Sequence, residues 1–318
     1  MKTIVVYNPS SGSGRGETIA AAVERSLDKR GFDVALHPTQ GPGDGTAIAR
    51  RFADAADVIV AVGGDGTVNE VVNGIDAGEG GAGGASPDAG EGGAGDASPD
   101  APGGRRRATL GIVPAGTVNV LALELGIPFQ VERACNVIAG GKTRRLDLGI
   151  ANGRRFTLMA GAGVDALTVR NIDLRAKRRF KELAFVGTGL RSGFTTPPPA
   201  FLVRAGGREY AATFFVAGNS RYYAAHIAVT PTADSADGLL DLLIFTGTTR
   251  SSLAVFWLEV PGGLHVRNAH VTCVRAERAE LLPMGDEGTV WFQTDGELAG
   301  CLPATVEIDA HALEVLVP

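Results

Sequence analysis

The chain has 318 residues, of which 44% are hydrophobic and 20% charged, a composition typical of a globular protein with room for two domains. Its formal net charge of −5 argues against general binding to nucleic acid. No stretch approaches the roughly 20 apolar residues of a membrane span, so we expect any membrane contact to be peripheral. Cys135, Cys273 and Cys301 lack Cys-x-x-Cys spacing, which indicates buried, reduced thiols of a cytoplasmic protein and neither a disulfide framework nor a zinc site.

Strands and helices are predicted to alternate over the first 125 residues. Short apolar runs rich in β-branched residues predict strands at 2–7, 32–36, 58–62 and 110–113. Segments with apolar residues on one face predict helices at 17–30, 46–55, 68–75 and 118–125. This alternation predicts an α/β domain with a parallel sheet that binds ligands at the carboxyl ends of its strands.

One stretch does not belong to that sheet. Residues 77–88 recur as 89–100 with a single difference, Gly84 against Asp96. Glycine, alanine and proline make up 21 of the 28 residues from 77 to 104, too little side-chain volume to build a core. We interpret 77–104 as a disordered repeat insertion; a functional tether is the alternative.

After about residue 140 the pattern changes to short strands separated by turn residues. The expected strands are 146–150, 156–160, 201–204, 212–217, 239–245, 270–274, 290–294 and 305–308. One helix, at about 164–190, interrupts them before Pro197. We therefore predict a mainly antiparallel, β-sandwich-like domain at 141–318 after an α/β domain at 1–140.

Two glycine-rich segments of the first domain point to phosphate chemistry. Residues 8–16 (NPSSGSGRG) lie between a strand and a helix, where glycine lets the backbone approach a ligand and the helix start offers free N–H groups. Residues 62–70 (VGGDGTVNE) add one carboxylate, Asp65, which can meet Mg²⁺ or a hydroxyl beside a polyphosphate. Each segment is also compatible with a simple strand-to-helix turn.

These segments resemble the diacylglycerol kinase catalytic-domain family, which includes bacterial lipid kinases and relatives of the sphingosine kinases. The resemblance extends from Thr3 to Pro318, apart from the insertion. Its further motifs, in chain order, are PAGTVN at 114–119, LDLG at 146–149, NSRYY at 219–223, DGLLD at 237–241 and DGE at 295–297.

The resemblance implies an enzyme that uses ATP and Mg²⁺, with a role for each matching residue. Catalysis would fall to Glu297 as proton acceptor, with Asp295 beside it and Asp65 at the phosphates. A structural Mg²⁺ would lie at Asp237. The implied nucleotide-binding residues are Asn8, Pro9, Ser10, Gly12, Thr39, Gly63, Gly64, Asp65, Gly66, Thr67, Asn69 and Thr117.

The predicted function is an ATP-dependent lipid kinase that phosphorylates a hydroxyl of a membrane lipid such as diacylglycerol. The enzyme is expected in the cytoplasm, peripherally associated with the membrane, without nucleic-acid partners and with a homodimer left open. Val120 stands where many members have Asp, and Ala224-Ala225 where a glycine pair is common, so the acceptor lipid stays undetermined.

Two alternatives remain open for the function. One is an enzyme like NAD kinase with a soluble acceptor, and the other is a non-catalytic nucleotide- or lipid-binding protein. The six cations of residues 170–181 fit either a docking face for anionic headgroups or a solvated helix face.

Overall fold

The computed structural model describes residues 1–75, 107–164, 166, 200–224, 226–285 and 289–318. The repeat insertion at 77–104, most of the helix expected at 164–190, its basic segment 170–181, and Ala225 lie outside the described residues. Within the described ranges, no helix is long and apolar enough to cross a membrane.

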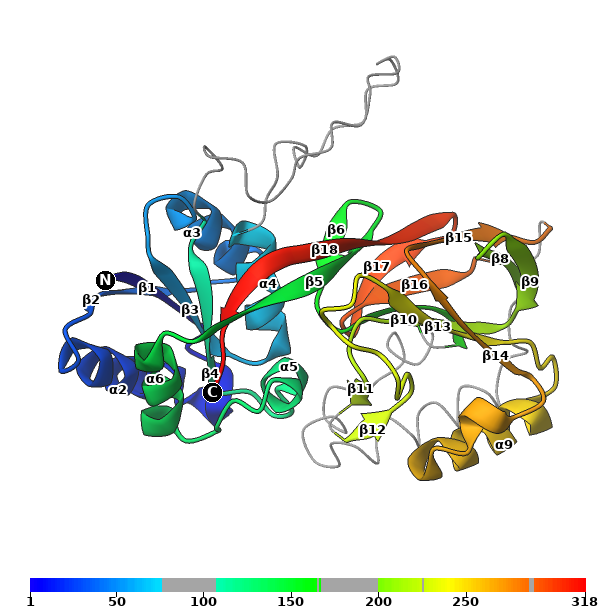
Figure 1. Cartoon of the computed structure of the whole chain (residues 1–318), viewed down its shortest axis with the longest axis horizontal. Coiled ribbons are helices and arrows are strands. Elements are labelled where there is room, and N and C mark those ends of the chain that lie inside the picture. Colours follow the sequence, from blue (N-terminus) through cyan, green and yellow to red (C-terminus); the bar gives the residue numbers. More distant parts are fainter. Residues whose placement is uncertain (76–106, 165, 167–199, 225, 286–288) are drawn as a thin grey trace, which may run out of the picture.

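The N-terminal region is a parallel sheet covered by helices (Figure 1). The strand order is β2-β1-β3-β4, and all neighbours in it run parallel. β3 is buried along its whole length, as expected of a strand with both faces covered. The bounds are β1 Lys2–Tyr7, α1 Ser11–Gly14, α2 Gly16–Asp28, β2 Asp33–Pro38, α3 Asp44–Phe52, β3 Val58–Gly63, α4 Asp65–Ile75, β4 Thr109–Pro114, α5 Val120–Glu124 and α6 Val131–Gly140. The predicted α/β fold is confirmed, although α6 was not among the expected helices.

The second region is a sandwich of two largely antiparallel sheets. One has the order β14-β13-β10-β7-β16-β17, and the other contains β18-β15-β8-β9, with β5 beside β18 and β6 beside β5. Four fully buried phenylalanines lie between them, Phe156, Phe201, Phe215 and Phe292. This confirms the predicted sandwich. The bounds are β5 Thr143–Ala151, β6 Arg154–Phe156, β7 Met159–Gly163, β8 Phe201–Ala205, β9 Arg208–Ala212, β10 Phe214–Gly218, β11 Tyr222–Ala224, β12 Ile227–Ala228, β13 Leu240–Phe245, α9 Arg250–Glu259, η1 Val260–Gly262, η2 His265–Arg267, β14 Val271–Ala276, β15 Arg278–Pro283, β16 Trp291–Thr294, β17 Glu297–Cys301 and β18 Ala304–Leu316.

The last strand joins the two regions. β18 pairs antiparallel with β5 and, near its start, with β15, and its Val315 then pairs parallel with Leu110 of β4. In Figure 1 it runs as one long red strand from the sandwich into the N-terminal sheet. The sequence predicted a strand at 305–308 only. The longer strand makes one sheet continuous through both regions, which limits how far the regions can move apart.

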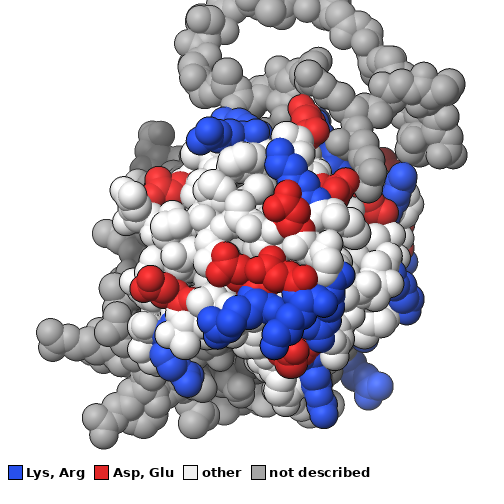
Figure 2. Space-filling view, turned by 90° about the vertical axis from the view of Figure 1, so that its left-hand side faces the viewer, with Lys and Arg blue, Asp and Glu red and all other residues white. Residues whose placement is uncertain are grey.

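Several smaller expectations differ from the structure. α9 was not predicted, because exposed Val255 and Leu258 place apolar residues opposite the buried face of Phe256 and Trp257 and so weaken the helical pattern in the sequence. Of the cysteines expected to be buried, Cys135 is buried, whereas Cys273 is exposed and Cys301 partly exposed. Figure 2 views the N-terminal region, where acidic and basic side chains lie beside one another.

Candidate active site

The two glycine-rich segments, 8–16 and 62–70, meet the PAGTVN motif at 114–119 at one edge of the parallel sheet, after β1, β3 and β4. The amide of Ala115 donates to the carbonyl of Gly63 over 2.8 Å, which joins the loops after β3 and β4. A Cβ atom on Gly116 would lie 2.4 Å from Cα of Gly64, closer than real Cβ contacts. Backbone therefore passes directly against backbone here, and glycine is required at this crossing.

Two adjoining cavities open above this edge. The larger, of about 1320 Å³, lies between the loop after β1, the start of α2 and the loops after β3 and β4. The smaller, of about 530 Å³, lies between the loops after β1 and β2 and the start of β17. Together they offer the room that a nucleotide with its polyphosphate needs. Both cavities are lined by Asn8, Ser10, Gly66 and Thr67.

Most residues predicted to bind nucleotide line these cavities. The larger cavity adds Gly12, Gly64 and Thr117 to the shared four, and the smaller adds Pro9 and Thr39. Gly63, Asp65 and Asn69 line neither of the two. Gly63 instead packs against Thr67, whose Oγ1 would lie 2.3 Å from a Cβ at Gly63.

Asp65 begins α4 and directs its carboxylate toward the first turn of α5. Its Oδ1 accepts the N–H of Leu121 over 3.3 Å. Burial raises the pKa of Asp65 to about 6; N–H groups at the start of α5 oppose the rise, and the carboxylate of Asp295 adds to it. Two neighbouring acidic groups form a setting that a cation would stabilise. Asp65 stands between Gly64 and Gly66, which line the larger cavity, and is the carboxylate of this pair that would hold a Mg²⁺ arriving with a nucleotide triphosphate.

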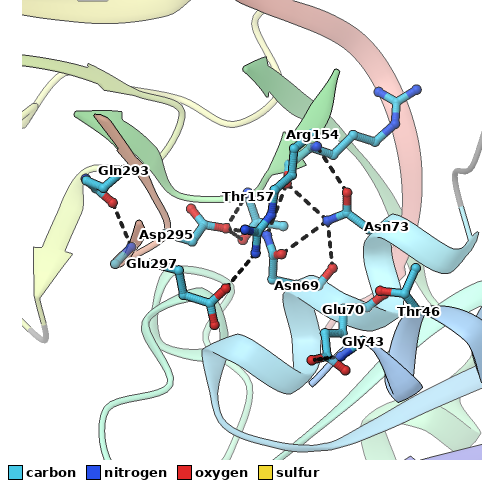
Figure 3. Close-up of polar contacts among 12 residues, drawn as sticks. Gly43, Thr46, Asn69, Glu70, Asn73, Arg154, Thr157, Gln293, Asp295 and Glu297 are labelled. Atoms are coloured by element: carbon cyan, nitrogen blue, oxygen red, sulfur yellow. Dashed lines mark hydrogen bonds and ion pairs between the residues drawn. The ribbon is translucent and has the colours of Figure 1, made fainter. Parts of the chain in front are cut away.

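Asp295 lies in the turn between β16 and β17, and its carboxylate is saturated with protein donors. Oδ2 accepts from Nδ2 of Asn69 at 2.8 Å and from the amide and hydroxyl of Thr157 at 2.8 and 3.1 Å. Oδ1 accepts from the amides of Leu158 and Met159 at 2.9 and 3.0 Å. Burial raises the pKa of Asp295, and the donors on residues 157–159 oppose the rise. These five hydrogen bonds fasten the turn to β7 and, through Asn69, to α4 (Figure 3).

Glu297, two residues later, is held very differently. Its side chain is 55% exposed and lines the smaller cavity. Oε2 receives a hydrogen bond from an Nη atom of Arg154 at 2.6 Å. Oε1 lies 3.5 Å from where a Cβ of Gly66 would be. Glu297 therefore lies beside the loop after β3 in the wall of the smaller cavity, with Oε1 close to Gly66.

Glu70 is a site residue that the sequence prediction did not assign. Its two carboxylate oxygens accept the N–H groups of Gly43 and Gly45, both at 2.9 Å, and its carbonyl accepts the hydroxyl of Thr46 at 3.0 Å (Figure 3). Glu70 also lines the smaller cavity. It thereby holds the start of α3 beside Thr39, and its sequence signal was its place at the end of the 62–70 segment.

Asn73 and the backbone of Arg155 form a second connection that the motifs did not indicate. Nδ2 of Asn73 donates to the carbonyl of Arg155 at 3.0 Å, and Oδ1 accepts the amide of Arg155 at 3.1 Å. Nδ2 of Asn69 adds a longer contact to the same carbonyl at 3.2 Å. The side chain of Arg155 pairs with Asp309 of β18 at 2.8 Å. α4 is thus joined to the β5–β6 hairpin of the second region.

Asp237 lies in the loop before β13, where an arginine pairs with its carboxylate; the structural Mg²⁺ that the family resemblance implies there, completed mainly by backbone carbonyls, stays a prediction. Oδ1 of Asp237 accepts the amide of Leu239 at 3.1 Å, and its Oδ2 pairs with Arg275. The described residues contain no group of three or more His, Cys, Asp or Glu side chains that could hold a metal ion. We therefore derive no step through a metal at Asp237.

The NSRYY motif at 219–223 fastens the second region to α5. Glu124 of α5 accepts from the hydroxyl of Ser220 at 3.0 Å and from Nε of Arg221 at 2.9 Å. Val120, at the start of the same helix, is only 4% exposed and packs in the N-terminal core. The apolar residue at this position is therefore used in packing.

Comparisons with known proteins agree with this architecture. The diacylglycerol kinase catalytic domain matches residues 2–151, and the YegS C-terminal NAD kinase beta sandwich-like domain matches residues 159–317. A diacylglycerol kinase of Bacillus subtilis (strain 168) is 26% identical over 94% of this chain and 90% of its own length. One from Staphylococcus saprophyticus subsp. saprophyticus is 27% identical over 99% of this chain and 94% of its own.

A solved structure gives the same result for the fold. The crystal structure of a diacylglycerol kinase from Bacillus anthracis str. Sterne superposes with a TM-score of 0.74 at 24% identity, over 100% of this chain and 96% of that one. The family expected from the sequence motifs is confirmed. The chain belongs to the diacylglycerol kinase catalytic-domain family and is an enzyme of the lipid-kinase class.

Proposed function

We propose that this enzyme transfers the γ-phosphate of ATP to a hydroxyl group of a membrane lipid such as diacylglycerol. The observation that carries the proposal is the position of Glu297, which lines the smaller cavity close beside Gly66. A carboxylate beside a phosphate-binding loop is placed to receive the proton of an attacking alcohol.

The N-terminal region, residues 1–140, would bind the nucleotide as its Mg²⁺ complex. Glycines at Gly12, Gly64 and Gly66 let the triphosphate approach the backbone, and the amides of the loops after β1, β3 and β4 carry partial positive charge toward it. Bound Mg²⁺ would neutralise phosphate charge, and Asp65 is the carboxylate placed to hold it. Asn69 and Asp295 would act by fixing α4 to the turn between β16 and β17.

The chemical step would be an in-line displacement at the γ-phosphorus. The lipid hydroxyl oxygen forms the new bond to phosphorus, the bond to the β,γ-bridging oxygen breaks, and ADP leaves with that electron pair. Glu297 accepts the hydroxyl proton. Asp295 is poorly suited to this task, because both of its oxygens already accept hydrogen bonds from the protein.

The acceptor would be bound by the second region, residues 141–318, during peripheral contact with a membrane. Support comes from the relatives that match this chain over nearly their full length, because they are named diacylglycerol kinases. Val120 and Ala224 differ from the common family residues, so phosphorylation of a lipid alcohol other than diacylglycerol would also support the proposal.

The test is a transfer assay with γ-labelled ATP, Mg²⁺ and mixed vesicles that carry one lipid alcohol at a time. We expect label in a phospholipid product with at least one lipid, and none when EDTA removes Mg²⁺. NAD serves as the soluble acceptor in a parallel reaction. Transfer to NAD alone would replace the proposal with the soluble-acceptor function, and ATP binding without any transfer would replace it with the binding-protein function.

A further inference from the structure

Arg154 meets Glu297 from a hairpin that no motif singled out. It begins β6, directly after the β5–β6 turn, and donates to Oε2 of Glu297 over 2.6 Å. Both side chains are partly exposed, Arg154 by 39% and Glu297 by 55%. An ion pair this accessible to water contributes little to the stability of the fold. The contact is therefore too weak to matter as a fold-stabilising element.

The backbone beside Arg154 is fixed relative to the phosphate-binding loop. The next residue, Arg155, has its amide bonded to Asn73 and its carbonyl bonded to Asn69 and Asn73. Both asparagines belong to α4, the helix that begins at Asp65. A rigid helix thus sets the distance between the base of Arg154 and the glycine-rich loop.

The backbone of Glu297 is fixed as well, but its side chain is not. The preceding Asp295 is anchored by five hydrogen bonds, whereas the Glu297 carboxylate has Arg154 as its hydrogen-bond partner within the described part of the chain. A glutamate has several freely rotating side-chain bonds, so without a partner it samples many rotamers. Arg154 binds Oε2 and leaves Oε1 close to Gly66, which lines both cavities.

We propose that Arg154 is a positioning residue for the phosphoryl transfer: it holds Glu297 in the rotamer that presents Oε1 to the acceptor hydroxyl. The inference rests on the proposed function, in which Glu297 accepts the proton. Arg154 acts through Glu297 and does not bind the nucleotide. Its loss should lower the rate of the chemical step and leave ATP affinity unchanged.

The expected size follows from the strength of such a pair. Loss of the contact frees the rotamers of Glu297, and we expect the single-turnover rate to fall about 3- to 10-fold in Arg154→Gln. Arg154→Lys should recover at least half of the wild-type rate, because a single donor on a cation makes the contact. The dissociation constant for ATP should stay within about twofold of wild type.

A double-mutant cycle separates positioning from other roles. In Glu297→Gln, which has lost the proton acceptor, adding Arg154→Gln should change the remaining rate by less than about twofold. Arg144→Gln is the matched control, because Arg144 pairs with Asp234 at similar exposure, 43% and 57%, on the same strand pair. It should turn over like wild type.

Each result decides a different statement. Wild-type protein without lipid phosphorylation removes the proposed function itself. Active wild type and impaired Glu297→Gln, with Arg154→Gln as fast as Arg144→Gln, keeps the function and removes the role of Arg154. A weakened ATP affinity in Arg154→Gln, or a full further loss in the Glu297→Gln background, would mean that Arg154 contacts the phosphates, and the positioning role would be wrong.

Discussion

Two regions face each other across the candidate active site, and they are built in opposite ways. On the nucleotide side, backbone lies against backbone: a Cβ on Gly16 would lie 2.0 Å from the carbonyl oxygen of Asn8, and one on Gly116 would lie 2.4 Å from Cα of Gly64. On the acceptor side, the turn between β16 and β17 presents two carboxylates, Asp295 and Glu297. In the first region, glycines without side chains let the loops pass close together. In the second region, hydrogen bonds hold acidic side chains in place.

The two carboxylates of the turn between β16 and β17, Asp295 and Glu297, are also held differently. Asp295 accepts five hydrogen bonds from the protein and Glu297 accepts one. A saturated carboxylate has no lone pair positioned for substrate, whereas a half-exposed one has. We therefore expect Asp295 to matter for stability and Glu297 for turnover, and the first two of four substitutions test this division.

The largest effect is expected for Glu297→Gln. Removing the proton acceptor should lower turnover by about 10²–10⁴-fold, the usual contribution of a general base. The unfolding midpoint should hardly move, because the side chain is 55% exposed. Steady-state kinetics with a thermal melt checks both; a rate near that of wild type would remove Glu297 from the chemistry.

Asp295→Asn should reverse this pattern. The amide NH₂ of asparagine would face protein donors, so at least one of the five hydrogen bonds is lost and two donors oppose each other. We expect the free energy of unfolding to fall by about 1–3 kcal/mol, because the lost and opposed hydrogen bonds outweigh the relief of the burial that raises the pKa of Asp295. Urea denaturation measures the loss. Unchanged stability with abolished turnover would exchange the roles of the two carboxylates.

Gly116→Ala tests the nucleotide side. The new methyl group would overlap Cα of Gly64, so the loops after β3 and β4 must separate. The free energy of unfolding should fall by about 1–3 kcal/mol and ATP should bind more weakly. Gly126→Ala is a suitable comparison, because a Cβ there meets nothing within 4 Å, although its positive φ of 69° carries its own strain. Equal ATP affinity in the two variants would contradict the close-approach argument.

The smallest change is expected in the pH dependence of stability at Asp65. Its pKa in the folded protein, about 6, lies above its ordinary value of 3.8. The folded state therefore binds the proton more tightly, and the charged group costs stability above pH 6. This cost fades as the pH falls from 6 towards 4.

Asp65→Asn removes that cost and keeps an oxygen for the amide of Leu121. It should be more stable than wild type by about 1 kcal/mol at pH 8, with the difference shrinking by pH 4. The expected gain in stability is smaller than the full pKa shift of Asp65 would give, because Asp65 is partly accessible to water. Urea melts of both proteins at the two pH values give the comparison. A difference that grows toward low pH would contradict a raised pKa.

Much of the architecture could be predicted from short stretches of the sequence. The β-branched runs at 2–7 and 58–62 and the glycines after them predicted the parallel strands and their loops, because strand, turn and helix signals act over a few neighbouring residues. The same holds for the family motifs, whose glycines and acidic residues are recognisable one segment at a time. α9 was missed because apolar Val255 and Leu258 on its exposed face mask the period of its buried face.

Only the tertiary structure decided which of these residues meet. Arg154, Asn73 and Glu70 carry no motif of their own, and their importance comes from partners on other elements: Glu297, the backbone of Arg155 and the loop before α3. The length of β18 was likewise undecided until β4, β5 and β15 were in place beside it. Asp295 and Glu297 look alike in the sequence, two acidic residues around one glycine. Folding separates them, because five donors from residues 157–159 and from α4 converge on the first and water reaches the second.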